Sequence, residues 1–182
     1  MAMPVVVPTY TVDDLERFPD DGNRYELLDG LLLVSPLAGM PHQVVTWRLV
    51  TAISEALRPW PEILVASPGG VVLRPKTRLE PDILVFRAPV GAMVWENVPE
   101  HLLVVETASP STVIYDREFK RPAYLTLGVK EVWRVDIDER AIFVSKPDAP
   151  PDVAHLDQLT WAPTGLGAPF HVDVRQLFQG IP

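Results

Sequence analysis

Short apolar runs bounded by turn-forming residues constrain the fold of this chain more than any other feature. Each run is rich in Val, Ile and Leu, which is typical of buried strands. The runs occupy residues 63–66, 71–73, 83–86, 102–106, 131–136 and 141–144. Their number and shortness predict a sheet protein in which helices lie between some of the strands.

Helical segments separate these runs. Apolar residues recur at helical spacing over 42–57, and Pro59 closes that segment. A second helical stretch, over 112–127, contains Pro122, which predicts a kink, or a break with Pro122 starting a second short helix, because proline lacks the N–H donor and clashes with the preceding turn. A short helix is also expected over 11–18, where Thr11 is a suitable N-cap.

Hairpin signals complete the predicted architecture. Asp29-Gly30 lies between two apolar runs within 24–34, which is a strong hairpin signal. A second hairpin is expected between 131–136 and 141–144, and the tail from His155 is expected to add edge strands and a last helical turn. The fold class predicted is α/β (α+β mixed): a central mixed β-sheet flanked by helices, with an N-terminal hairpin.

Length and composition restrict the class of protein. A chain of 182 residues with 47% apolar content is expected to form one domain over 1–182. The absence of cysteine excludes disulfides and thiolate metal sites. There is no apolar stretch of membrane-spanning length, and the first residues lack the pattern of a signal peptide, so we expect a soluble cytoplasmic protein without a membrane partner.

The charge of the chain leaves two interpretations open. With 16 basic and 24 acidic residues, the net charge is −8, whereas nucleic-acid binders usually present a basic surface. A local field decides contact, however, and basic residues cluster on either side of two acids. These residues are Arg74, Lys76, Arg78 and Arg87 around Asp82, and Arg117, Lys120 and Arg121 after Glu106. They form either a local basic patch or ordinary solvated surface charges.

Two carboxylates and a lysine suggest the chemistry. Asp82 precedes the run 83–86, and Glu106 ends the run 102–106. Acids delivered to one cleft by neighbouring strands can share a divalent cation, since Mg²⁺ is typically held by one or two carboxylates together with waters and phosphate oxygens. Lys120 follows on the helical stretch, and a lysine beside such a pair points to phosphodiester hydrolysis.

An ordered set of motifs resembles a known family. The motifs are Arg24-Tyr25-Glu26-Leu27-Leu28-Asp29-Gly30, Ser35-Pro36 with His42, Pro81-Asp82-Ile83, residues 105–112, Asp116 to Lys120 with Tyr124, Gly128-Val129 and residues 131–136. Their order and spacing resemble the bacterial putative restriction endonuclease family, which belongs to the PD-(D/E)xK nuclease superfamily. The likeness extends over nearly the whole chain.

The resemblance implies roles for particular residues. Asp82 corresponds to the acid of the PD element and Glu106 to the second acid, and both would bind Mg²⁺ or Mn²⁺, with Glu26 as a third metal ligand. The superfamily's lysine usually lies two residues after the second acid, where this chain has Ala108. In this family the lysine is implied to come from the following helix, here Lys120, four residues after Asp116.

Two functions from different classes therefore remain. The first is a metal-dependent endonuclease that hydrolyses phosphodiester bonds of DNA, acting as a homodimer because both strands of a duplex must be reached and two-fold symmetry is common. The second is a catalytically silent protein that uses the same fold for binding or assembly. The acidic composition and Ala108 favour the second function.

Structural roles compete with the catalytic ones. Lys120 can form an exposed intrahelical pair with Asp116, and Glu26 can be an exposed hairpin residue. His42 is interpreted as a helix-start residue with a buried hydrogen bond, with a catalytic base as the alternative, and Tyr124 is interpreted as a core residue. Neither a phosphate-binding glycine loop with its lysine nor a Gly-x-Ser-x-Gly nucleophile elbow is present.

Overall fold

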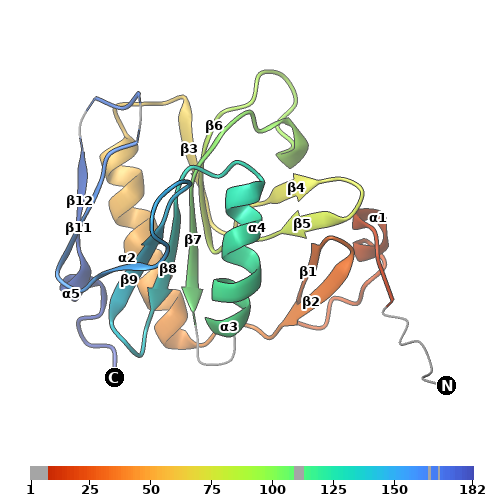
Figure 1. Cartoon of the computed structure of the whole chain (residues 1–182), viewed down its shortest axis with the longest axis horizontal. Helices are drawn as coiled ribbons and strands as arrows, with labels where there is room; N and C mark the ends of the chain where they lie inside the picture. The colour runs from red at the N-terminus through yellow and green to blue at the C-terminus, as the bar shows by residue number, and fades with distance from the viewer. Residues whose placement is uncertain (1–7, 109–112, 164, 168) are drawn as a thin grey trace.

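A six-stranded mixed sheet forms the centre of the protein (Figure 1). The computed structural model describes residues 8–108, 113–163, 165–167 and 169–182. The strand order is β10-β9-β8-β7-β6-β3, in which β7 and β8 are parallel and the other neighbouring pairs are antiparallel. The strands are β3 (Ile63–Ala66), β6 (Ile83–Arg87), β7 (His101–Ala108), β8 (Val132–Asp136), β9 (Ala141–Ser145) and β10 (Val153–His155). The predicted mixed sheet is thus confirmed.

Helix α2 (Met40–Leu57) covers one face of this sheet. It begins two residues before the predicted start and ends before Pro59. Strand side chains alternate between the two faces, so the odd-numbered positions of β6 and β7 meet this helix. The packed residues include Val45, Leu49 and Ile53 of α2, with Ile83, Val85, Leu103 and Val105 of the strands. Each such fully buried side chain stabilises the folded state by about 1.5–3 kcal/mol relative to leaving it exposed. The contact with α2 therefore determines which face of the sheet is turned to this helix.

A helical stretch made of three consecutive segments packs on the opposite face (Figure 1). It consists of α3 (Val113–Tyr115), a π-helical turn η2 (Asp116–Lys120) and α4 (Arg121–Thr126). Pro122 lies in the first turn of α4, where a missing N–H is tolerated, so it begins a short helix as predicted, but α4 follows η2 without a gap in the helical backbone. The predicted start at residue 112 lies outside the described residues. Tyr124 of α4 packs among Leu84 and Val104, even-numbered positions of β6 and β7.

A second, four-stranded sheet lies beside the first. It contains β1 (Arg24–Leu28), β2 (Leu31–Ser35), β4 (Val71–Leu73) and β5 (Thr77–Leu79), in the order β2-β1-β5-β4. The predicted N-terminal hairpin is confirmed, and Asp29 (φ 51°) and Gly30 (φ 84°) both have the positive φ that a type I′ turn requires. The run 71–73 therefore pairs in this sheet rather than in the central one. Strand β5 was not predicted, because its three residues include Arg78 and carry little apolar pattern.

Short elements at both ends of the chain complete the fold. Helix α1 (Val12–Leu15) begins at Thr11, whose side chain forms a reciprocal capping box with Asp14, and is shorter than predicted. Strands β11 (Gln158–Trp161) and β12 (Phe170–Asp173) pair with each other in a separate two-stranded sheet, not at the edge of the central sheet as predicted. Helix α5 (Val174–Leu177) follows them and is the predicted last helical turn. A 3₁₀ turn, η1 (Trp95–Asn97), precedes β7. None of the helices in the described ranges has both the length and the apolar character needed to cross a bilayer.

Gly69 provides a test of the packing at the start of β6. Its N–H donates to the Pro81 carbonyl at 2.9 Å, and a Cβ added there would lie 2.3 Å from Cβ of Leu84. We expect Gly69→Ala to lower the free energy of unfolding by about 1–3 kcal/mol, as overpacking does. Urea denaturation measures this change. Gly167→Ala is the control, because an added Cβ there meets no atom within 4 Å; similar effects of the two variants would contradict the packing.

Candidate functional site

Strand pairing brings Asp82 and Glu106 together on one face of the central sheet. Ile83 pairs with Val105 in the antiparallel register of β6 and β7, so Asp82 and Glu106 are one step further along the same pair of strands. Directly opposed residues of antiparallel strands point to the same face. Both line a pocket of about 230 Å³ together with Lys120, which we call the carboxylate pocket. The expectation that these carboxylates share a face and a cavity is met.

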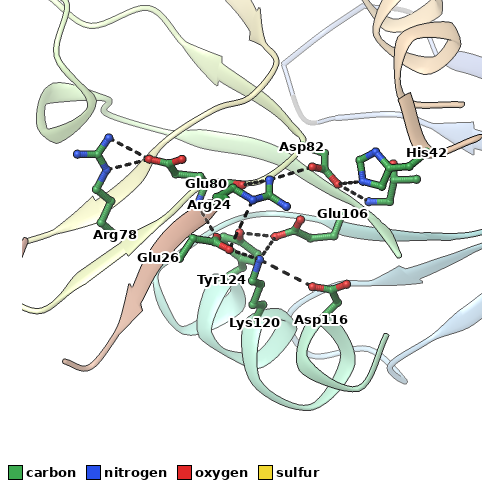
Figure 2. Close-up of polar contacts among 11 residues, drawn as sticks. Arg24, Glu26, His42, Arg78, Glu80, Asp82, Glu106, Asp116, Lys120 and Tyr124 are labelled. Atoms are coloured by element: carbon green, nitrogen blue, oxygen red, sulfur yellow. Dashed lines mark hydrogen bonds and ion pairs between the residues drawn. The ribbon is translucent and has the colours of Figure 1, made fainter. Parts of the chain in front are cut away.

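Asp82 is held by three partners from separate elements (Figure 2). Arg24 of β1 donates from Nη1 to Oδ1 at 3.0 Å, and His42 of α2 places Nε2 3.0 Å from Oδ2. The backbone N–H of Thr107 donates to Oδ2 at 2.8 Å. Burial alone would raise the pKa of Asp82, but the His42 contact, the Arg24 charge and this amide together hold the pKa below its usual value. Asp82 is therefore a carboxylate at neutral pH.

Glu106 is buried more deeply and behaves differently. The Tyr124 hydroxyl donates to its Oε1 at 2.6 Å, and Nζ of Lys120 lies 3.4 Å from the same oxygen. Burial, reinforced by the charges of Asp116, Asp82 and Glu26, raises the pKa of Glu106 to about 8, although Lys120 opposes the shift. In the absence of a cation, Glu106 thus carries a proton at neutral pH.

Lys120 lies at the centre of the acidic groups (Figure 2). Its Nζ is 2.7 Å from Glu26 Oε2, 3.4 Å from Glu106 Oε1 and 3.8 Å from Asp116 Oδ1. Burial opposes the ammonium form, but the three acids outweigh it and raise the pKa of Lys120. The alternative of an exposed pair with Asp116 was wrong, because Lys120 is only 3% exposed.

Glu26 is a buried anchor for Lys120. It is fully buried, so the alternative of an exposed hairpin residue was also wrong. Its Oε1 accepts the backbone N–H of Glu80 at 2.8 Å, and its Oε2 accepts Nζ of Lys120. Across the part of the chain that the structure describes, His, Cys, Asp and Glu side chains form no group of three that could hold a metal ion. The predicted ligand set of Asp82, Glu106 and Glu26 is therefore not assembled in this arrangement.

Several residues of the site were not predicted from the sequence. Arg24, besides its bond to Asp82, donates to the Glu80 carbonyl at 2.9 Å, and Thr107 supplies a backbone amide. Two signals were present: Arg24 lies two residues before Glu26, on the same face of β1, and Tyr124 lies one helical turn after Lys120. Tyr124 is a core residue as predicted, and it also binds Glu106. The buried hydrogen bond expected for His42 is the one to Asp82.

Five of the arginines singled out in the sequence form ion pairs with acids. Arg74 contacts Asp13 and Glu96, Arg78 lies 2.9 Å from Glu80, Arg87 3.3 Å from Glu100, Arg117 2.7 Å from Glu118, and Arg121 2.5 Å from Asp152. These arginines therefore bring little net positive charge to the surface, which favours the interpretation as ordinary surface charges over that of a basic patch.

The charge of the cluster fits a divalent cation. Four carboxyl groups, Glu26, Asp82, Glu106 and Asp116, surround two permanent cations, Arg24 and Lys120. Fully ionised, the acids outnumber the cations by two, and the proton on Glu106 removes part of this excess. Mg²⁺ requires only one or two protein carboxylates, because waters and phosphate oxygens complete its octahedron. Asp82 and Glu106 are thus a sufficient protein contribution.

Lys120→Ala tests whether the lysine is needed for stability. The substitution removes the nearest cation of the buried Glu26 and leaves only Arg24, whose Nε lies 3.9 Å from Oε2. Because a buried ion pair is broken, we expect the free energy of unfolding to fall by about 3–5 kcal/mol. Chemical denaturation of the metal-free protein measures it. Lys130→Ala, which removes an exposed lysine, is expected to change stability by no more than ~0.5 kcal/mol. Equally small losses of stability in both variants would instead favour the alternative in which Lys120 forms only an exposed pair with Asp116.

The raised pKa of Glu106 predicts a pH dependence of stability. Between its ordinary value of 4.5 and about 8, the folded protein binds a proton at Glu106 that the unfolded chain releases. The free energy of unfolding therefore falls as pH rises through this range. Glu106→Gln removes the ionisation, so its unfolding free energy, measured with urea and a chelator, should fall less than that of the wild type. Parallel pH profiles would contradict the shift.

Comparison with known proteins gives the fold and the family of the chain. No protein with a curated description matches the chain. The crystal structure of a putative nuclease from Anabaena variabilis superposes with a TM-score of 0.68 at 19% sequence identity, covering 93% of this chain and 98% of that one. At this identity the likeness shows the fold, which is restriction-endonuclease-like. The family model described as "Putative restriction endonuclease" matches residues 12–171. The chain therefore belongs to the Uma2 family of putative restriction endonucleases.

Proposed function

We propose that the protein is a metal-dependent nuclease that hydrolyses phosphodiester bonds of DNA. The observation that carries the proposal is the carboxylate pocket, in which Asp82 and Glu106 share one face with the ammonium of Lys120. Membership of a family described as putative restriction endonucleases supports the same reaction class. Asp82, Glu106 and Lys120 are the proposed catalytic residues, with Asp82 and Glu106 as ligands of Mg²⁺ or Mn²⁺.

Each residue has a distinct task in this mechanism. Bound Mg²⁺ or Mn²⁺ would supply charge neutralisation at a phosphate oxygen and a lowered pKa for water. Asp82 is already ionised and is oriented by Arg24 and His42, whereas Glu106 would release its proton to serve as a ligand of the cation. Tyr124 orients Glu106 through its hydroxyl. Lys120, fixed by Glu26, directs its ammonium at the attacking water or at the charge that develops on phosphorus oxygens.

A catalytically silent binding or assembly protein is the second candidate. The ion pairs between arginines and acids favour this candidate, because duplex binding depends largely on arginine and lysine side chains that are free to contact phosphates. A titration with Mg²⁺ or Mn²⁺ separates the two candidates, because a ligand of the folded state raises the melting temperature by mass action. A nuclease is expected to show the rise. The homodimer remains a prediction, which light scattering checks.

Asp82→Asn tests the proposed function. Removing the charge of a metal ligand is expected to abolish the cation-dependent rise in melting temperature and to reduce DNA cleavage by about 10²-fold or more, as loss of a key electrostatic contact does. Cleavage of labelled DNA with Mn²⁺ and thermal melting are the measurements. Asp136→Asn is the matched control, because Asp136 is similarly buried, pairs with Arg134 at 2.8 Å and does not line the carboxylate pocket. Unchanged cleavage in Asp82→Asn would reject the assignment.

A further inference from the structure

A larger pocket opens beside the carboxylate pocket. Its volume is about 580 Å³, and we call it the side pocket. The two pockets share Arg24, Pro36, His42 and Asp82 in their walls. When a phosphate lies at Asp82, the group attached to that phosphate can therefore extend directly into the side pocket.

The walls of the side pocket combine aromatic and polar groups. Phe18 and Tyr25 contribute two rings, stacked with centroids 5.0 Å apart and planes 8° from parallel. Asn23, Gln43 and Arg78 contribute hydrogen-bonding groups. Unpaired nucleobases are recognised in this way, by contact with aromatic or guanidinium planes and by hydrogen bonds to their edges. The volume also falls within the ~300–1,000 Å³ usual for small-molecule sites.

The charge of the side pocket suits a base better than a further phosphate. Glu16, Asp20 and Glu80 line it, and the guanidinium of Arg78 lies 2.9 Å from Glu80. These carboxylates repel phosphate, but they accept hydrogen bonds from amino groups of bases. Arg74 and Arg87, which lie outside both pockets, are themselves paired with acids, so they offer little net charge to the backbone of a long duplex.

We propose that the side pocket binds one unpaired nucleobase of DNA next to the phosphate held in the carboxylate pocket. The preferred substrate class is accordingly single-stranded or locally unpaired DNA rather than continuous duplex. This inference rests on the proposed function, because it takes the phosphate to lie at Asp82 and Glu106. Arg78 and Tyr25 contact the base and determine this preference.

Binding measured separately from cleavage tests the inference. Fluorescence anisotropy with a labelled mixed-sequence single strand, and with its duplex, gives affinities in Ca²⁺, while parallel incubations with Mg²⁺ or Mn²⁺ give cleavage. We expect the single strand to bind about tenfold more tightly than the duplex, and Arg78→Ala to weaken single-strand binding by about tenfold, within the range measured for stacked bases. Arg87→Ala is the matched control, since Arg87 is similarly exposed and also pairs with a glutamate, but lies outside both pockets.

Tyr25→Leu gives a second, independent variant, and melting temperatures verify that each variant is folded. A folded Tyr25→Leu protein is expected to lose affinity for the single strand and not for the duplex. Equal affinity for single strand and duplex, equal effects of Arg78→Ala and Arg87→Ala, or no binding to DNA would each overturn the inference. Single-strand binding with this mutational pattern but no cleavage in Mg²⁺ or Mn²⁺ would support the pocket and reject the nuclease. If the protein instead cleaves duplex and single-stranded DNA equally well, and Arg78→Ala does not change cleavage, the nuclease would be supported and the base-binding pocket rejected.

Discussion

The contact between Lys120 and Glu26 is the interaction on which the rest of the site depends. Both side chains are almost fully buried, and removing either would leave the other charge in the interior with only more distant ionic partners. The contact joins η2, on one side of the central sheet, to β1 of the smaller sheet. It therefore sets the position of the ammonium relative to Glu106, and it also holds the smaller sheet against the helical stretch.

Charge balance explains why the two proposed metal ligands differ so much. Asp82 receives hydrogen bonds from an arginine and a backbone amide and contacts a histidine. Glu106 accepts a hydrogen bond from a tyrosine hydroxyl, and the ammonium of Lys120 is 3.4 Å away. One acid is thus charged at neutral pH, and the other holds a proton. In the proposed mechanism, a divalent ion would replace that proton and neutralise the same excess charge.

Much of the central fold was predictable from local sequence, whereas the contacts across the site were less so. Short apolar runs identified β3 and β6 to β9, and Asp29-Gly30 identified the first hairpin, because these signals operate between neighbours in the chain. The second sheet was missed because β1 pairs with β5 about fifty residues away, through a strand centred on Arg78. Strand position and family resemblance singled out Asp82, Glu106 and Lys120, which do line one pocket, and their catalytic roles stay a prediction. The burial of Lys120 and Glu26 was not, since it arises only when β1 and η2 pack together.

Two ion pairs link β1 to the rest of the site, Arg24 with Asp82 and Glu26 with Lys120, and they limit how the sequence of the site can change. A lineage that lost the reaction could not readily discard these residues one at a time, because each single loss would remove the nearest partner of a charge in a largely buried cluster and lower the stability of the fold. Escape would require replacement of the whole group by apolar side chains of similar volume, which a buried cluster tolerates well. Relatives of this protein are therefore expected to show the cluster either complete or exchanged together, with few partial versions.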